Sequence, residues 1–91
     1  MASDRIPKQN PRTAYRLVED RGLLVVIDNR ELHTLNEVAA RVWSLCDGRA
    51  VDAIVEEIIA EFQVDAERAR TDVDTFLAQL DGVGALSWSQ P

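Results

Sequence analysis

Cysteine and histidine are almost absent from this sequence, which contains one of each, Cys46 and His33. A single cysteine excludes an internal disulfide, and its place in an apolar helical pattern favours a buried packing thiol over a reactive one. His33 has no cysteine or second histidine beside it, so a zinc site of the usual ligand number would need carboxylates or another chain. We therefore expect no metal and no cofactor, and we interpret His33 as a surface side chain, with contact to a bound peptide as the alternative.

Long apolar runs are also absent. No segment approaches the roughly 20 apolar residues that a membrane helix requires. The start, MASDRIPKQNPRT, is polar and interrupted by proline, unlike a secretion signal. We therefore expect a cytoplasmic protein without a membrane partner.

Motifs for catalysis are missing as well. The sequence has no glycine-rich phosphate loop and no nucleophile motif. Paired acids such as Glu56 and Glu57 have no predicted pocket around them that would suit acid–base chemistry. We expect the protein not to be an enzyme.

Positive charge is scarce in most of the chain, and the net charge is −6. Residues 1–30 carry six basic against four acidic side chains, whereas residues 31–91 carry four arginines against twelve acids. Nucleic-acid affinity comes largely from cations that neutralise phosphates, so this balance disfavours a nucleic-acid partner. It suits a partner with basic residues.

Three short segments near the amino terminus have strand patterns. Ala14 to Asp20 alternates roughly, Leu23 to Asp28 is a β-branched apolar run, and Glu31 to Leu35 is a third candidate. The connectors around Gly22 and Asn29 are short and rich in turn formers. We therefore predict an antiparallel meander of three strands.

The third strand pattern runs directly into a helix. Thr34 to Glu37 matches a capping box, and Asn36 is a competing cap. An apolar stripe follows, and Gly48 offers the left-handed conformation that ends a helix. We expect function at this junction, because it places a sheet edge beside a helix.

Two further helices are predicted. Val51 to Phe62 has one apolar stripe and an acidic opposite face, which we interpret as solvated. The third helix is capped by Asp65 and stops near Gly82 or Gly84. The predicted fold is therefore α+β, three antiparallel strands followed by three helices, with a winged helix-turn-helix outline.

The ends of the chain are predicted to lie outside this domain. Residues 1–12 contain two prolines and no periodicity, so we expect a flexible arm. The domain is expected over residues 13–86 and a tail over residues 87–91.

The order of these features resembles the PqqD-like family, the recognition elements of bacterial pathways that modify ribosomally made peptides. The resemblance covers Thr13 to Leu86. It rests on Leu35-Asn36, Trp43 with Asp47-Gly48, the acidic second helix, Asp72-Val73, Phe76-Leu77, Leu80 and Gly84-Ala85-Leu86. One departure is Ala50, where a Ser or Thr cap is expected for the second helix.

The resemblance implies a non-catalytic protein that binds the leader segment of a precursor peptide and presents it to a modifying enzyme, often a radical-SAM enzyme. The family's namesake serves pyrroloquinoline quinone synthesis. It also implies that the leader adds as a strand to the edge of the third strand, in a groove beside the third helix. An edge strand suits this mode because its unpaired backbone groups can bind an extended peptide.

The candidate peptide-binding residues follow from this placement. We expect contacts from the edge strand and from one border of the third helix, chosen because Phe76 lies nearer to it. The set is Glu31, Leu32, His33, Thr34, Leu35, Arg68, Ala69, Asp72, Val73 and Phe76.

Two other functions remain open. One is a winged-helix DNA-binding regulator, but the third helix carries five acids against Arg68 and Arg70 between residues 65 and 81, the wrong sign for a major groove. The other is an assembly subunit that binds no leader peptide. The free edge also leaves open whether two copies pair into a homodimer.

Overall fold

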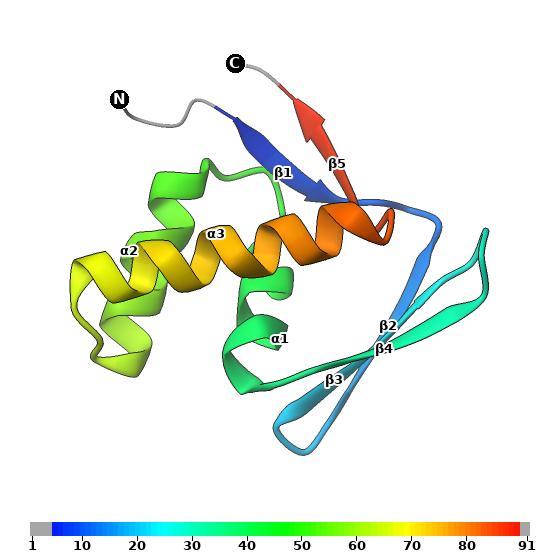
Figure 1. The fold of residues 1–91 in the computed structure, drawn as a ribbon, viewed down its shortest axis with the longest axis horizontal. Coiled ribbons are helices and arrows are strands. Elements are labelled where there is room, and N and C mark those ends of the chain that lie inside the picture. Colours follow the sequence, from blue (N-terminus) through cyan, green and yellow to red (C-terminus); the bar gives the residue numbers. More distant parts are fainter. Residues whose placement is uncertain (1–4, 90–91) are drawn as a thin grey trace.

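A computed structural model describes residues 5–89 of the chain, which fold into five strands and three helices (Figure 1). The elements are β1 Ile6–Gln9, β2 Thr13–Val18, β3 Arg21–Val26, β4 Glu31–Leu35, α1 Glu37–Ser44, α2 Val51–Phe62, α3 Ala66–Gly82 and β5 Leu86–Ser89. The predicted α+β class, with an antiparallel meander ahead of the helices, is confirmed.

The meander has the strand order β2-β3-β4, so that β2 and β4 are its edges within the described residues. Leu24 of β3 lies opposite Tyr15 of β2 and His33 of β4. Leu24 and Val26 are buried, whereas the alternating residues Leu23 and Val25 are only partly covered. This alternation is expected of a sheet with one face on the core and the other toward solvent.

The two ends of the chain form a second small sheet, which the sequence analysis did not predict. β1 pairs with β5 in antiparallel register, from Ile6 opposite Ser89 to Gln9 opposite Leu86. The backbone N–H of Gln9 also donates to the Cys46 carbonyl at 3.0 Å. The expected arm and tail therefore differ from the structure over these residues, and their remaining ends, residues 1–4 and 90–91, lie outside the described range. A four-residue strand whose partner is at the other end of the chain has no local sequence pattern that would show it.

The start of α1 is set by Asn36 rather than by Thr34. The Asn36 side chain accepts a hydrogen bond from the Ala39 backbone N–H at 2.8 Å, while Thr34 stays inside β4. The helix ends at Ser44, earlier than expected. Gly48 does have the positive φ predicted for it, 113°, but uses it in the turn that follows the helix.

The other two helices begin and end close to the predicted positions. α2 has the predicted bounds, and Ala50 ahead of it makes no side-chain cap hydrogen bond. At the start of α3, the Asp65 side chain accepts from the Arg68 backbone N–H at 2.7 Å. None of the helices in residues 5–89 combines the length and apolar character needed to cross a membrane.

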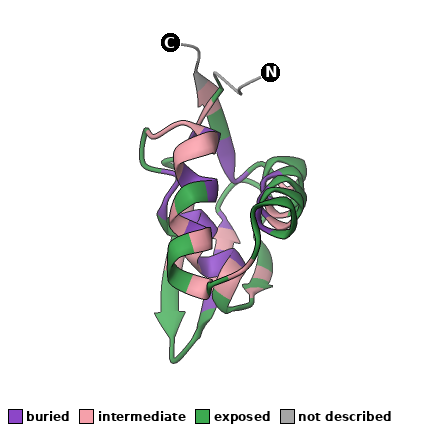
Figure 2. Ribbon diagram, turned by 90° about the vertical axis from the view of Figure 1, so that its left-hand side faces the viewer, coloured by how far each residue is buried: buried purple, intermediate pink, exposed green. Residues whose placement is uncertain are grey.

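The core lies where the helices meet the inner face of the meander. α1 packs on β3, and α3 packs on both α1 and α2. Trp43 of α1 is 1% exposed and its ring centroid lies 5.8 Å from that of Tyr15. Figure 2 shows buried and exposed residues in stripes along the helices, as one-sided packing requires.

Candidate functional site

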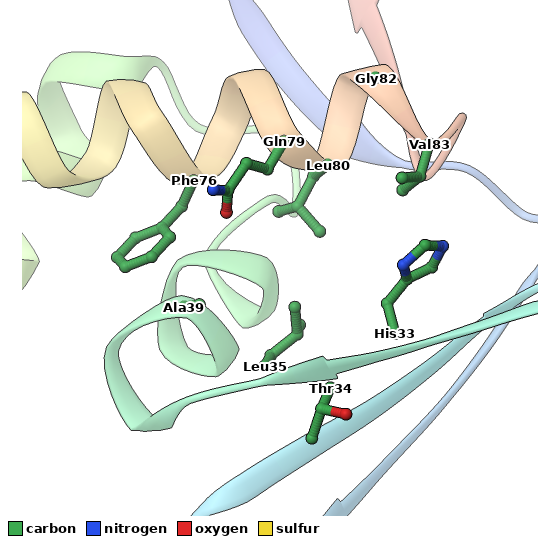
Figure 3. A pocket seen from close by; sticks show the side chains of 9 residues that line it. All are labelled: His33, Thr34, Leu35, Ala39, Phe76, Gln79, Leu80, Gly82 and Val83. Carbon is green, nitrogen blue, oxygen red and sulfur yellow. The ribbon is translucent and has the colours of Figure 1, made fainter.

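A groove of about 340 Å³ lies between β4 and the carboxyl-terminal half of α3 (Figure 3). Its floor includes Ala39 of α1, so that three elements contribute to it. The lining residues are His33, Thr34, Leu35, Ala39, Phe76, Gln79, Leu80, Gly82 and Val83. Most of these side chains are apolar, which makes the groove suited to apolar groups of a ligand.

β4 forms one side of this groove and is also a sheet edge. It pairs with β3 on one side, and no strand of the described residues pairs with its other side. Edge strands present backbone N–H and C=O groups that another extended chain can pair with. The structure thus combines a free strand edge with an apolar groove alongside it.

The side chains of β4 divide between the two faces of the sheet. His33 and Leu35 are partly buried and point toward the helices, whereas Thr34 points the other way (Figure 3). Glu31 and Leu32 are exposed, and neither lines the groove. Of the predicted strand residues, His33, Thr34 and Leu35 therefore line the groove.

On the β4 side of the groove, the imidazole of His33 is a polar group of the lining. Its Nε2 atom is buried and has no hydrogen-bond partner among the described residues. Across the groove, the Gln79 side chain extends from α3 toward the same space (Figure 3). A ligand could meet these two polar side chains along a largely apolar surface.

The predicted residues of α3 are distributed differently. Phe76 lines the groove as expected. Ala69 and Val73 are both 0% exposed and belong to the core, so their side chains do not reach the groove. Arg68 and Asp72 form an ion pair on the surface, 3.3 Å between Nε and Oδ2, and neither lines the groove.

The predicted set omits Gln79, Leu80, Gly82 and Val83, which line the groove, and the reason is geometric. A projection at 100° per residue gives the face of a helix but not which part of its length lies opposite a given strand. β4 meets α3 near its carboxyl end, so groove residues are found from Phe76 onward. Gln79 lies on the same border of the helix as Phe76, which was the available signal.

Cys46 lies apart from this groove, in the core. Burial, and secondarily the negative charge of Asp47, raise the pKa of its thiol from 9.0 to about 12. A thiol with a raised pKa stays protonated at neutral pH. The Cys46 side chain is 1% exposed and belongs to the core, which confirms the interpretation as a packing residue. Within residues 5–89, no three His, Cys, Asp or Glu side chains are grouped as metal ligands.

The family of the chain is established by its sequence. A family model described as coenzyme PQQ synthesis protein D (PqqD) matches residues 22–86, which include β4, all three helices and the whole groove. The chain belongs to the PqqD family. No curated protein sequence was found to match this PqqD-family chain.

Solved structures support the same assignment. The chain is similar to TbiB1 in complex with the TbiA(beta) leader peptide, with 27% identity and a TM-score of 0.81 over 88% of this chain and 94% of that one. It has the fold of a lasso peptide synthetase B1 complexed with its leader peptide, with 18% identity and a TM-score of 0.78 over 90% and 98% of the two chains. It also has the fold of the PqqD part of Methylobacterium extorquens PqqCD, described as a functional, stand-alone RiPP recognition element, with 21% identity and a TM-score of 0.73 over 89% and 87%.

Proposed function

We propose that this PqqD-family chain binds the leader segment of a ribosomally made precursor peptide in the groove between β4 and α3, and presents it to a modifying enzyme. The observation that carries the proposal is the free edge of β4 beside the apolar groove. Two solved structures of similar fold are described as complexes with leader peptides, which supports the same class of ligand here. The role is binding, without catalysis by this chain.

In the proposed complex, the leader extends the meander by one strand. Its backbone pairs with β4 between Glu31 and Leu35, and its alternate side chains point into the groove. Those side chains contact Leu35, Phe76 and Val83, while a polar group of the leader reaches His33 or Gln79. Backbone pairing provides affinity for any extended chain, and the groove selects the sequence.

The expected free energy of leader binding is of the size that a transient complex requires. About four backbone hydrogen bonds contribute roughly 1 kcal/mol each. A few buried apolar side chains add about 1.5–3 kcal/mol each, against several kcal/mol for ordering the peptide. The expected dissociation constant is micromolar to sub-micromolar, which corresponds to a binding free energy of about −8 to −9 kcal/mol.

Charge argues against DNA binding through the same helix. Asp74 and Asp81 are exposed on α3. The two arginines of this helix are already paired, Arg68 with Asp72 and Arg70 with Asp52. Phosphate contacts need cations that are free to meet them.

The other alternative is an assembly subunit that binds no leader peptide. That function would leave the groove beside β4 without a ligand.

A titration of labelled leader peptide tests the proposal. The peptide comes from a short precursor gene beside a gene for a modifying enzyme, and a scrambled peptide of the same composition is the control. Binding in the micromolar range or tighter, with amide shifts in β4 and the second half of α3, is expected. Equal binding of the scrambled peptide, or tighter binding of duplex DNA, would overturn the proposal.

A further inference from the structure

A second groove, of about 300 Å³, lies at the opposite edge of the meander. It runs between β2 and the helices α1 and α2, and its apolar surface includes Leu17, Ala40 and Phe62. Leu17 is 59% exposed although it lies on the face of β2 that is turned toward the helices. An exposed leucine at the mouth of a groove marks surface that a partner can cover.

The strand beside this groove is also free. β2 pairs only with β3 among the described residues, so its other side presents unpaired backbone groups. The meander thus offers two edges, each with a groove between the strand and the helices. The groove beside β4 is the proposed leader site, and the groove beside β2 has no role in that function.

The charges at the second groove differ from those at the first. Glu19, Asp20, Glu37 and Glu61 line it, with Arg41 as the one lining cation. Arg41 is engaged already, because its guanidinium lies 2.8 Å from the Glu61 carboxylate. This hydrogen bond lowers the pKa of Glu61, which keeps that carboxylate charged, and the other three acids remain unpaired among the described residues.

We propose that the groove beside β2 binds a segment of the modifying enzyme in which apolar and basic side chains alternate. This inference rests on the proposed function and adds the site that holds the enzyme. The apolar side chains of the segment pack on Leu17 and Phe62, and its basic side chains meet Glu19, Asp20 and Glu37.

The arrangement explains how one small domain can hold two chains at once. The leader would lie along β4 and the enzyme segment along β2, with β3 between them. The acidic groove also favours association with a basic surface through long-range attraction, which salt weakens. Binding of the enzyme should therefore depend on ionic strength more than binding of the leader does.

A direct test uses two synthetic hexapeptides, one alternating leucine with lysine and the other alternating leucine with glutamate. The isotope-labelled protein is titrated with each, and backbone amide shifts are followed by NMR. We expect the lysine peptide to shift amides of β2, the first turn of α1 and the end of α2. The inference is overturned if those amides do not move, or if the glutamate peptide moves them equally.

Adjacent residues of β2 offer a matched pair of variants. Leu17→Ser removes an exposed apolar side chain from the groove, whereas Val18→Ser removes one, 46% exposed, that does not line it. We expect the first to weaken lysine-peptide binding about tenfold and the second to leave it unchanged. Equal effects of both variants, or none from Leu17→Ser, would overturn the inference.

Carboxylates are tested in the same way. Glu19→Gln together with Glu37→Gln should weaken lysine-peptide binding and reduce its salt dependence, whereas Glu56→Gln, exposed on α2 outside the groove, should not. The same variants are then measured with the modifying enzyme encoded beside the precursor gene, and the groove variants should lose affinity for it. Retained affinity for the enzyme would overturn the assignment of the occupant.

Two further measurements separate this inference from its alternatives. The protein alone should not sediment as a dimer that depends on Leu17. If a dimer were present and Leu17→Ser abolished it, the occupant of the groove would be a second copy of this chain. Leader-peptide affinity should be unchanged by Leu17→Ser. Leader binding without lysine-peptide binding would overturn the second site alone. Lysine-peptide binding without leader binding would overturn the proposed leader function, and with it the enzyme as occupant, while the site for a basic segment would stand.

Discussion

The Asn36 side chain accepts a hydrogen bond from the Ala39 backbone N–H at 2.8 Å. This bond ends β4 at Leu35 and begins α1 one residue after the cap. Ala39 lies on the floor of the groove beside β4. One cap therefore determines both the length of the free strand edge and the position of the helix beneath it.

Asn36→Ala should destabilise the protein and weaken leader binding together. Loss of an N-cap side chain costs about 0.5–2 kcal/mol of unfolding free energy, measurable by urea denaturation. Leader affinity should fall as well, because the end of β4 loses its anchor. Ala50→Ser supplies the cap that α2 lacks and should raise the unfolding free energy with no effect on leader affinity. A fall in stability for this second variant would contradict the account of the caps.

Phe76→Ala should weaken leader binding about tenfold, as expected when an aromatic wall of an apolar groove is removed. Phe62→Ala is the matched control, since Phe62 is also partly buried but lines the groove beside β2. Titration of both variants with the same labelled leader, at a temperature where circular dichroism shows them folded, distinguishes the two grooves. An equal loss of leader affinity in both would mean that the loss comes from packing and not from contact.

Gly22→Ala should destabilise the protein by about 1–3 kcal/mol. A Cβ at Gly22 would lie 2.7 Å from Cε1 and 2.8 Å from Oη of Tyr15, closer than side chains can approach without moving. Gly82→Ala is the control, because a Cβ there meets nothing within 4 Å and alanine is the better helix former. Urea denaturation of the two variants should give changes of opposite sign; changes of equal sign and size would refute the contact with Tyr15.

Cys46 should make stability fall with rising pH above about pH 9. The thiol has a pKa raised to about 12 in the folded chain against 9.0 ordinarily, so the unfolded chain loses its proton first and binds fewer protons across that window. The stabilisation is complete below the unfolded pKa and is lost as pH approaches the folded value. Comparison with Cys46→Ala isolates this contribution, because the variant should show a shallower loss of stability in that range.

A thiol reagent gives an independent check on Cys46. The folded protein should react with a maleimide far more slowly than the urea-unfolded protein at neutral pH, since the thiol is buried and protonated. Equal rates in the two states would contradict burial of the thiol.

Much of the fold followed from local sequence patterns. The bounds of α2, the cap at Asp65 and the three strands of the meander could be predicted because apolar spacing and capping residues report local structure directly. The packing role of Cys46 was predictable for the same reason. β1 was not predictable, because a short strand is defined by its partner, and that partner is at the other end of the chain.

The candidate site likewise had a part that could be predicted from the sequence and a part that could not. The family resemblance implied a strand edge at β4 and a groove beside α3, and four of the predicted residues line that groove: His33, Thr34, Leu35 and Phe76. It also placed Ala69 and Val73 in the wall, although they are core residues. Which part of α3 lies opposite β4, and the existence of a second groove beside β2, depend on how the helices pack against the meander. The sequence alone determined the acidic character of the chain by composition, and it determined the meander strands, the helices and their apolar faces because these depend on neighbours a few residues apart. Only the tertiary structure decided which residues share a groove, because that depends on contacts between segments far apart in the chain.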